Sequence, residues 1–533
     1  MQGCPLSMLI YTFYNADLID IAKGKFELST GFVDDCTFVA VADTLDEAHK
    51  TLKNMMEWPN GRLDWSHGHN SPFEITKLTV IDFARTPNDI ASSPLIINRN
   101  QTDGSRSQHA ISTVNNYKYL GVMFNPKLSW RAHITKVIAK TSCWMQLLWR
   151  LSKMASGLSP SKMCPLYNTI TVPALTYACD VWYTPPPYKL HHCRNARGSI
   201  RDTKLLQPIQ AHATRLIMGG LCGTAFNILK VHVNTPPIDL LFRKAQINAA
   251  AHLSSLLPKH PLHVTVHRVA RQFVNCHKSP LHYLFHNTQI DPKHSEIITP
   301  TRRHPSYTPP LTTRINTSKE SALELAQKTH QHFRFKVYCN GSVLEGRVGA
   351  AAILYKHNNV IKASQYHLGK SSKHTIYEAE LVGILLELNL LTSIASQLTR
   401  TTLIGLDSQA GICALNNQKS KPSHYLLDHV LTAAESLHMK QDKLINAADF
   451  HKAKCQGIQL TVKTRDVIDL KVHWIPGHKD FIPNEKADEL AKKAAKGESN
   501  PNPSLPKLLR HSLPTSTAAI KQDLKLKVQN RWK

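Results

Sequence analysis

The spacing of apolar residues changes character well past the middle of the chain. Up to residue 287, apolar residues recur mostly every three or four positions, which predicts amphipathic helices. The expected helices cover residues 6–22, 44–57, much of 130–180 and 205–257. β-forming residues dominate shorter stretches, which predict strands at residues 26–33, 36–42 and 119–124, and a strand pair or one bent strand at residues 73–83.

The C-terminal third alternates between strands and helices. The pattern predicts three strands, a long helix, a strand, two helices, a strand and a last helix. Their ranges are 334–339, 347–355, 359–367, 375–395, 402–406, 408–416, 423–440, 469–475 and 483–496. This order is typical of an α/β sandwich with a mixed sheet and flanking helices.

Composition divides the chain further. Residues 288–332 combine several prolines with Thr, His and Arg, which is typical of a linker. We find no internal repeat. The expected parts are a mixed region at 1–125, a mainly helical region at 126–287, a Pro/Thr-rich basic linker at 288–332, an α/β domain at 333–497 and a basic tail at 498–533.

The charge of the chain is strongly positive. Its 533 residues include 65 Lys and Arg against 38 Asp and Glu, a formal net charge of +27 and a pI of about 9.6. A surplus of this size favours a polyanionic partner, and nucleic acid is the usual one. The basic residues are spread along the chain, which fits contacts along a phosphate backbone better than a short targeting signal. The competing interpretation is a basic protein without a specific partner.

Cysteine usage and hydropathy bear on the compartment. There are 11 Cys and no CxxC pair, so neither a disulfide framework nor a zinc finger is indicated. Reduced thiols in an intracellular protein are the expectation, with nucleus and cytoplasm both open. No run of about 18 apolar residues occurs, so we expect no membrane span. The N-terminus lacks a basic leader and opens directly into a patterned helix, as if it continued a longer protein.

Three acids of the C-terminal third stand where a metal-dependent nuclease would need them. Asp407 ends the apolar strand TLIGLD, and ligand sites in α/β sheets lie beyond such strand ends. Glu380 lies in the long helix, where Thr375 and Glu378 form a capping box and leave Glu380 to face the sheet. Asp488 lies in the last helix. Taken singly, each acid is more often a solvated side chain; their joint order favours a shared site.

The segments around these acids resemble ribonuclease H of type 1. They are YCNGS (338–342), AEL (379–381), DSQ (407–409), HWIPGH (473–478) and NEKADELAKKA (484–494). The resemblance covers about 165 residues in the family's motif order. It implies a ribonuclease H-like mixed sheet and hydrolysis of RNA in RNA–DNA hybrids, with Glu380, Asp407 and Asp488 as ligands of two Mg²⁺ ions, or of Mn²⁺. It also implies that His478 assists proton transfer and product release.

One position departs from the family. Asn340 stands where the family has the Asp of the first strand, and an Asn oxygen contacts a metal without bringing charge. A unit charge pair about 4 Å apart is worth about 4 kcal/mol at a dielectric near 20, so we expect a loss on the order of 10³-fold or more in metal affinity or rate. Glu345 is the nearest acid downstream, but we expect it in the hairpin after the strand and not as a replacement.

The N-terminal region resembles reverse transcriptases of non-LTR (LINE-type) retrotransposons. The resemblance lies in QGCPLSMLIYTFYNADL (2–18), FVDD (32–35), Lys77 in FEITKLTVIDF, and YKYLGVMFNPKLSWRAHI (117–134). It implies a partial palm at 1–125 and a thumb and connector at 126–287. Asp34 would be the metal ligand, Asp35 its neighbour, and Lys77 would lie near the incoming nucleotide.

The resemblance also implies that fingers and the palm strand with the first catalytic Asp belong upstream of Gln2. A polymerase site without that strand cannot hold two ions, so we expect no DNA synthesis by this chain. Incorporation in a primer-extension assay on an RNA template would overturn this expectation.

Three hypotheses follow from the sequence. The chain is a Mg²⁺-dependent endonuclease for RNA–DNA hybrids, or a nucleic-acid binder disabled by Asn340, or a degraded fragment of an element without a selected role. Hybrid recognition would rest on phosphate and 2′-hydroxyl contacts. Binding would therefore depend steeply on salt and little on base sequence.

Overall fold

The fold is that of a computed structural model. It describes residues 4–22, 24–84, 91, 93–100, 106–152, 157–185, 199–272, 279–300, 303–304, 306–398, 400–417, 419–456, 468–477 and 480–532. The chain forms two compact units. The first comprises residues 1–177 and 204–224, and the second comprises residues 178–203 and 225–533.

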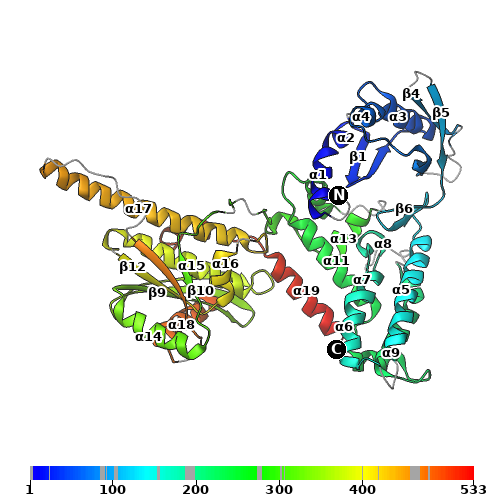
Figure 1. Ribbon diagram of the computed structural model, residues 1–533. Helices are drawn as coiled ribbons and strands as arrows, with labels where there is room; N and C mark the ends of the chain where they lie inside the picture. The colour runs from blue at the N-terminus through cyan, green and yellow to red at the C-terminus, as the bar shows by residue number, and fades with distance from the viewer. Residues whose placement is uncertain are drawn as a thin grey trace. The chain divides into compact units, whose positions relative to one another are not determined.

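The first unit combines helices with small sheets (Figure 1). Its N-terminal elements are α1 (Pro5–Tyr14), α2 (Ala16–Asp20), β1 (Glu27–Phe32), β2 (Asp35–Ala40), α3 (Leu45–Glu57) and α4 (Arg62–Gly68). They are followed by η1 (Ile75–Lys77), β3 (Thr79–Val80), β4 (Leu95–Asn100), β5 (Arg106–Thr113), β6 (Tyr117–Tyr119) and β7 (Val122–Phe124). Its remaining helices are α5 (Arg131–Leu151), α6 (Pro160–Leu166), η2 (Tyr167–Thr171), α7 (Val172–Leu175) and most of α9 (Ile200–Met218).

Two of the strand expectations in this unit are confirmed and two need correction. The antiparallel pair β1–β2 encloses the predicted turn, with Phe32 opposite Asp35. Residues 73–83 instead form a 3₁₀ turn and a two-residue strand. Residues 119–124 form a hairpin rather than one strand, because Leu120 and Gly121 both have positive φ, as two-residue hairpin turns require.

The second unit begins with a helical part. It contains α8 (Cys179–Trp182), α10 (Phe226–Val233), α11 (Ile238–Ser254), α12 (His263–Arg271), α13 (Pro280–Thr288) and η3 (Pro292–His294). Small residues on α11 let the other helices approach closely. Ala250 and Ala251 are fully buried and pack with Val266, Leu284 and Phe285 of α12 and α13.

A six-stranded mixed sheet forms the centre of the rest of the second unit. Its strands are β8 (Thr312–Arg314), β9 (Phe335–Leu344), β10 (Arg347–Lys356), β11 (Asn359–Lys370), β12 (Arg400–Leu406) and β13 (Ile468–Trp474). Their spatial order is β11-β10-β9-β12-β13-β8. The first three pair antiparallel, while β9, β12, β13 and β8 run parallel. The predicted βββαβ order and mixed sheet are confirmed.

Helices cover both faces of this sheet (Figure 1). They are α14 (Lys319–His332), α15 (Ile376–Ser393), α16 (Gln409–Asn416), α17 (His424–Gln456) and α18 (Ile482–Lys496). One core joins α15, α16 and α17 to the sheet, and a second joins α14 and α18 to its other face. The predicted long helix begins with the expected capping box, because the side chains of Thr375 and Glu378 each bond the other's backbone N–H.

Two segments contain more structure than their composition indicated. The segment 288–332, interpreted as a linker, contains β8 at the sheet edge and α14 on one face. The segment 498–533, interpreted as a basic tail, contains η5 (Asn502–Ser504), η6 (Lys507–Arg510) and α19 (Thr517–Trp532). Leu505, Leu509 and Leu513 of this segment are buried in the main core. Apolar residues at a four-residue spacing therefore dock the tail although its net charge is basic.

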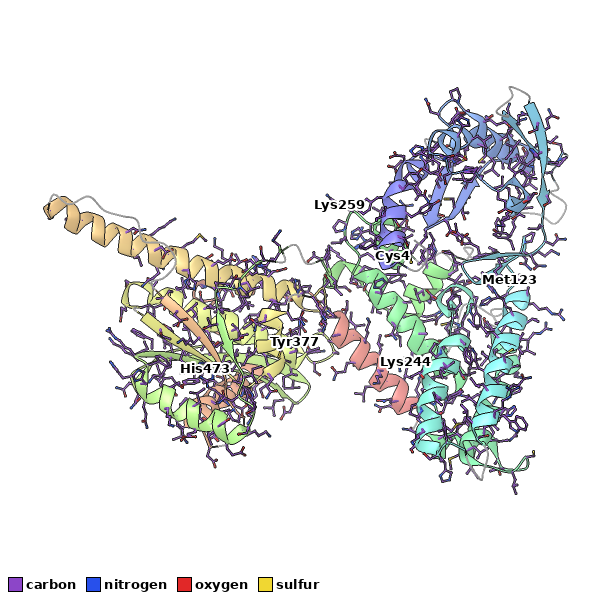
Figure 2. All side chains as sticks on the ribbon, viewed as in Figure 1. Cys4, Met123, Lys244, Lys259, Tyr377 and His473 are labelled. Carbon is purple, nitrogen blue, oxygen red and sulfur yellow. The ribbon has the colours of Figure 1, made fainter. Side chains whose placement is uncertain are left out.

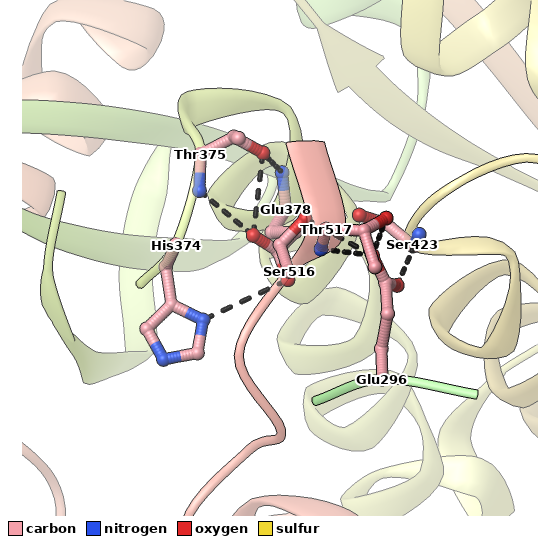
Figure 3. A network of polar contacts seen from close by, with 7 residues as sticks. All are labelled: Glu296, His374, Thr375, Glu378, Ser423, Ser516 and Thr517. Atoms are coloured by element: carbon pink, nitrogen blue, oxygen red, sulfur yellow. Dashed lines mark hydrogen bonds and ion pairs between the residues drawn. The ribbon is translucent and has the colours of Figure 1, made fainter. Parts of the chain in front are cut away.

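A buried polar network joins four segments of the second unit (Figure 3). Its centre is Glu296, whose side chain is 1% exposed. One carboxylate oxygen accepts a hydrogen bond from the N–H of Ser423 at 2.6 Å. The other accepts bonds from the N–H of Thr517 at 2.7 Å, its hydroxyl at 2.9 Å and the Ser516 hydroxyl at 3.2 Å. Glu296 therefore caps the N-termini of α17 and α19 together, where a negative charge is favoured.

The same network reaches the start of α15. The N–H of Ser516 donates to the carbonyl of Lys373 at 2.8 Å. His374 lies next in the chain, with its Nδ1 3.6 Å from an oxygen of Glu378. Burial raises the pKa of Glu296, and the hydrogen bonds from Ser423 and Thr517 offset part of that rise. The helical part, the sheet domain and the C-terminal helix are thus held at one buried point.

The face covered by α14 contains a histidine that makes stability depend on pH. His330 contacts the rings of Tyr338, Tyr355 and Phe481, and burial lowers its pKa to about 4. Between that value and the ordinary value near 6.5, the unfolded chain binds a proton that the folded chain does not. Stability therefore falls as pH drops through this window, by about 1.4 kcal/mol per pH unit from this residue.

Replacing His330 by Phe should remove that contribution to the pH slope of the unfolding free energy. Urea titrations at several pH values between about 4 and 6.5 measure the slope. The control is His332→Phe on the exposed side of the same helix, which should leave the slope unchanged. Equal slopes in the parent chain and His330→Phe would contradict the assignment.

Candidate active site

Three of the predicted site residues come together where β9 and β12 lie side by side. The parallel register pairs Leu406 with Cys339, so the next step brings Asp407 alongside Asn340. Gly341 lies against the start of α15: a side chain there would come within 2.8 Å of Ala379 and 2.9 Å of the backbone nitrogen of Glu380. The absence of a side chain at residue 341 thus allows α15 to bring Glu380 to this strand end.

Glu380 and Asp407 interact electrostatically. Burial raises the pKa of Glu380, the neighbouring Asp407 carboxylate raises it further, and a hydrogen bond from Ser408 lowers it. Ser408 is also the N-cap of α16, where its hydroxyl accepts from the N–H of Gly411 at 3.1 Å. The two partly buried carboxylates therefore repel each other, and a cation between them would relieve that repulsion.

Asp407 is held from the β13 side. The indole N–H of Trp474 donates to the Asp407 carbonyl at 3.0 Å, and the N–H of Ile475 donates to the Leu406 carbonyl at 2.7 Å. Gly477 lies beside the carboxylate, because a Cβ built there would be 3.4 Å from an Asp407 oxygen. His478, the predicted proton-transfer residue, lies outside the described residues.

Asp488 lies on α18, which packs on β9 and β10. Its carboxylate forms an ion pair with Lys492 one turn later, at 2.6 Å. One turn earlier, Asn484 is 4% exposed, and its side-chain oxygen has no hydrogen-bond partner among the described residues. Ala487 and Ala491 form the fully buried face of the helix.

The residues present do not fit a two-ion metal site. Asn340 is buried to 8% exposure and contributes no charge. Within the described residues, no group of three His, Cys, Asp or Glu side chains is arranged to hold a metal ion. Glu345 does not substitute for Asn340, because it lies with Gly346 in the exposed two-residue turn between β9 and β10, both with positive φ. The site as built therefore holds two adjacent carboxylates and a neutral amide.

A further acid lies deeper in the same helix. Glu387 is two turns beyond Glu380 and fully buried, and neither carboxylate oxygen has a partner of normal hydrogen-bond geometry in the described structure. Burial raises its pKa well above the ordinary value, while an interaction with the Cys339 thiol, a weak donor, lowers it. Burial thus favours the uncharged form of the Glu387 carboxyl.

Removing this carboxyl should stabilise the fold. Because the folded pKa is raised, the folded chain binds a proton that the unfolded chain has released above about pH 4.5, so stability falls as pH rises, by about 1.4 kcal/mol per unit. Glu387→Gln should remove that slope, and Glu387→Leu should raise stability near pH 7 by about 1–3 kcal/mol. Urea unfolding measures both.

The control for Glu387 is Glu485→Gln, an exposed acid of α18 whose loss should change neither quantity. A Glu387→Leu variant that is less stable than the parent would show that the buried carboxyl makes a favourable contact.

The candidate polymerase residues lie in the first unit. Asp34 is in the turn between β1 and β2, Asp35 is the first residue of β2, and both are exposed. Lys77 ends η1, is exposed, and forms an ion pair with Glu74. No described contact joins Lys77 to the two aspartates. Among the described residues of this unit, no three His, Cys, Asp or Glu side chains are grouped so as to hold a metal ion.

Sequence reasoning did not single out Ser408, Trp474, Asn484 or Glu387. Ser408 and Trp474 lie within the motifs DSQ and HWIPGH. Their residue types do not indicate chemistry, because their polar groups act by hydrogen bonding to Glu380 and Asp407. Glu387 carried a usable signal, since an acid within the apolar run LLELNLL of a core helix is unusual. Asn484 is distinguished by burial, which only the fold reveals.

Comparison with protein families bears on the C-terminal region. The RNase H family model matches residues 333–496. This part of the chain is an RNase H domain, as its motifs and sheet order predicted. None of the helices in the described parts of the chain combines the length and apolar character needed to cross a membrane.

Two curated relatives are mobile-element proteins of flies. The probable RNA-directed DNA polymerase from transposon X-element of Drosophila melanogaster is 25% identical over 226 residues, which is 41% of this chain and 21% of the relative. The RNA-directed DNA polymerase from mobile element jockey of Drosophila funebris is 24% identical over 187 residues, 34% of this chain and 19% of the relative. The matched part thus spans about a fifth of each relative, and the similarity to these reverse transcriptases is distant.

Solved structures of RNase H proteins also match. RNase H1 from the archaeon Halobacterium salinarum has a TM-score of 0.21 and 15% identity, covering 31% of this chain and 100% of that one. LC11-RNase H1, solved in complex with RNA/DNA hybrid, has a TM-score of 0.22 and 15% identity, covering 30% of this chain and 96% of that one.

Proposed function

We propose that this chain binds nucleic acid through its RNase H domain, with RNA–DNA hybrid as the intended ligand, and that Asn340 leaves it with little hydrolytic activity. The observation that carries the proposal is the buried amide of Asn340 beside Asp407, at the position where the resemblance to ribonuclease H implies a further carboxylate. Glu380, Asp407 and Asp488 are the proposed residual ligands of Mg²⁺ or Mn²⁺. His478 is the proposed proton-transfer residue.

Charge supports the binding half of the proposal. A net charge of +27 on 533 residues favours phosphate contacts that do not depend on base sequence. In hybrid recognition, 2′-hydroxyl groups distinguish the RNA strand from DNA. Loss of one ligand charge weakens metal binding far more than it weakens these backbone contacts. Nucleic-acid binding is therefore retained where cleavage is lost.

The test is titration of the full chain with a labelled RNA–DNA hybrid, and with DNA and RNA duplexes of the same length. We expect the hybrid to bind at least as tightly as either duplex, with affinity falling steeply between about 50 and 200 mM salt. We expect little cleavage in Mg²⁺. An affinity that does not change with salt would contradict the proposed binding through phosphate contacts. Multiple-turnover cleavage of the hybrid would contradict the proposed lack of hydrolytic activity.

We also propose that residues 1–125 are a partial palm, that residues 126–287 are thumb and connector, and that the chain does not polymerise DNA. Support comes from Asp34 and Asp35, which lie at a hairpin turn as the polymerase motif requires but are exposed. The primer-extension assay described above tests this, with no incorporation as the expected result.

A further inference from the structure

A groove separates α11 and α19 in the helical part of the second unit. The two helices pack through Leu240, Ile247 and Val528. Beside that contact lies a cavity of about 380 Å³, lined by Lys244, Ile247, Asn248, Lys521, Gln522 and Lys525. Lys244 is labelled in Figure 2. Five of the six lining side chains are therefore polar, and three carry positive charge.

The charges of the three lysines are not neutralised by any ion pair among the described residues. Lys527, which lies outside the groove on the same helix, pairs with Asp523 at 2.8 Å. No carboxylate of the described residues forms an ion pair with Lys244, Lys521 or Lys525. Lys521 and Lys525 are four residues apart on one helix, and like charges at that spacing repel each other. Lys244 adds a third like charge from the facing helix.

We propose that the groove between α11 and α19 binds the phosphodiester backbone of a nucleic-acid strand, at a site separate from the RNase H domain. Phosphate oxygens would accept from the three ammonium groups, and their charge would remove the repulsion among them. Asn248 and Gln522 also line the groove, and their side-chain amides are donors of the kind that often contact phosphates. None of the described residues that line the groove is aromatic, so contacts to the backbone rather than base stacking would hold the strand.

The test compares the full chain with the variant Lys244→Gln/Lys521→Gln/Lys525→Gln. Binding of short labelled oligonucleotides of mixed sequence is measured against salt, as single strand, hybrid and DNA duplex. For the nucleic acid that the groove binds, loss of three phosphate contacts should reduce the slope of log affinity against log salt by about 2–3. The affinity for that nucleic acid near 0.1 M salt should fall by about 10²-fold. The form with the largest loss identifies the strand that the groove accepts.

The matched control is Lys259→Gln/Lys293→Gln/Lys527→Gln, which removes three charges of the same unit outside the groove. It should change the slope little. Equal losses in the two variants would overturn the proposal, because net charge alone would then explain the effect. Unchanged nucleic-acid binding in the groove variant would overturn it too.

A second variant guards against misfolding. Lys525→Glu changes one exposed side chain and should by itself lower the slope by about 1 or more. The proposal is independent of the function proposed for the RNase H domain. If the groove did not bind nucleic acid, the Asn340→Asp chain should still cleave the hybrid. If that variant did not cleave the hybrid, the salt dependence measured for the groove variants should be unchanged.

Discussion

The variant Asn340→Asp should cleave the RNA strand of a hybrid in Mg²⁺ about 10³-fold faster than the parent chain. The new carboxylate would lie beside Asp407 in the β9–β12 register, near Glu380. One added charge at about 4 Å contributes about 4 kcal/mol at a dielectric near 20, and each 1.4 kcal/mol corresponds to a factor of ten. The assay is single-turnover cleavage of a labelled hybrid by the full chain.

Melting temperatures measured with and without Mg²⁺ separate this explanation from a general change in the protein. Without metal, the added carboxylate repels those of Asp407 and Glu380, so Asn340→Asp should melt at a lower temperature than the parent and regain stability when Mg²⁺ is added. The control, Asn359→Asp, adds the same charge at the exposed start of β11 and should show neither effect. Equal cleavage by parent and Asn340→Asp would mean that the amide is an adequate ligand.

The largest loss of stability is expected from Glu296→Ala. The substitution leaves two backbone N–H groups and two hydroxyls without their shared acceptor, at the starts of two helices. Each unsatisfied buried donor costs about 1–3 kcal/mol, partly offset because a buried carboxylate is also removed, so we expect a total loss of about 3–5 kcal/mol. Thermal unfolding measures the loss, and faster hydrogen exchange at the amides of Ser423 and Thr517 should locate it.

Two further substitutions test the role of the acceptor. Glu296→Gln keeps one oxygen but turns an amide donor toward either Ser423 or Thr517, so it should cost about 1–3 kcal/mol. Glu324→Ala, which removes an exposed acid of α14 paired with Lys328, should change stability by less than about 0.5 kcal/mol. If Glu296→Ala were as mild as Glu324→Ala, the network would not hold the segments together.

Local signals explain which parts of the fold were predictable. Thr375 and Glu378 specify the start of α15 within four residues, and the apolar run before Asp407 specifies β12 and its end. Such features depend on neighbours in the sequence, so the pattern alone reveals them. The grouping of Asn340, Glu380 and Asp407 followed from the family's motif order rather than from spacing.

The parts that were missed depend on distant partners. β8 has three residues, no apolar alternation, and a pairing partner more than 150 residues away, so nothing local distinguishes Thr312–Arg314 from a loop. The four-residue spacing of Leu505, Leu509 and Leu513 was present in the sequence, but the basic charge of the segment outweighed it. The acceptor role of Glu296 has no local signature, because its donors come from two other segments.

The Glu296 network also sets an order of events during synthesis. Thr517 lies 221 residues after Glu296, and at about 5–20 residues per second the ribosome needs roughly 10–45 s to make that stretch. During that interval the Glu296 carboxylate has no α19 N-terminus to accept hydrogen bonds from. The apolar side chains of α11 that pack on α19 are exposed to solvent. Until α19 is made, the nascent helical part therefore exposes apolar surface, and exposed apolar surface of this kind favours aggregation.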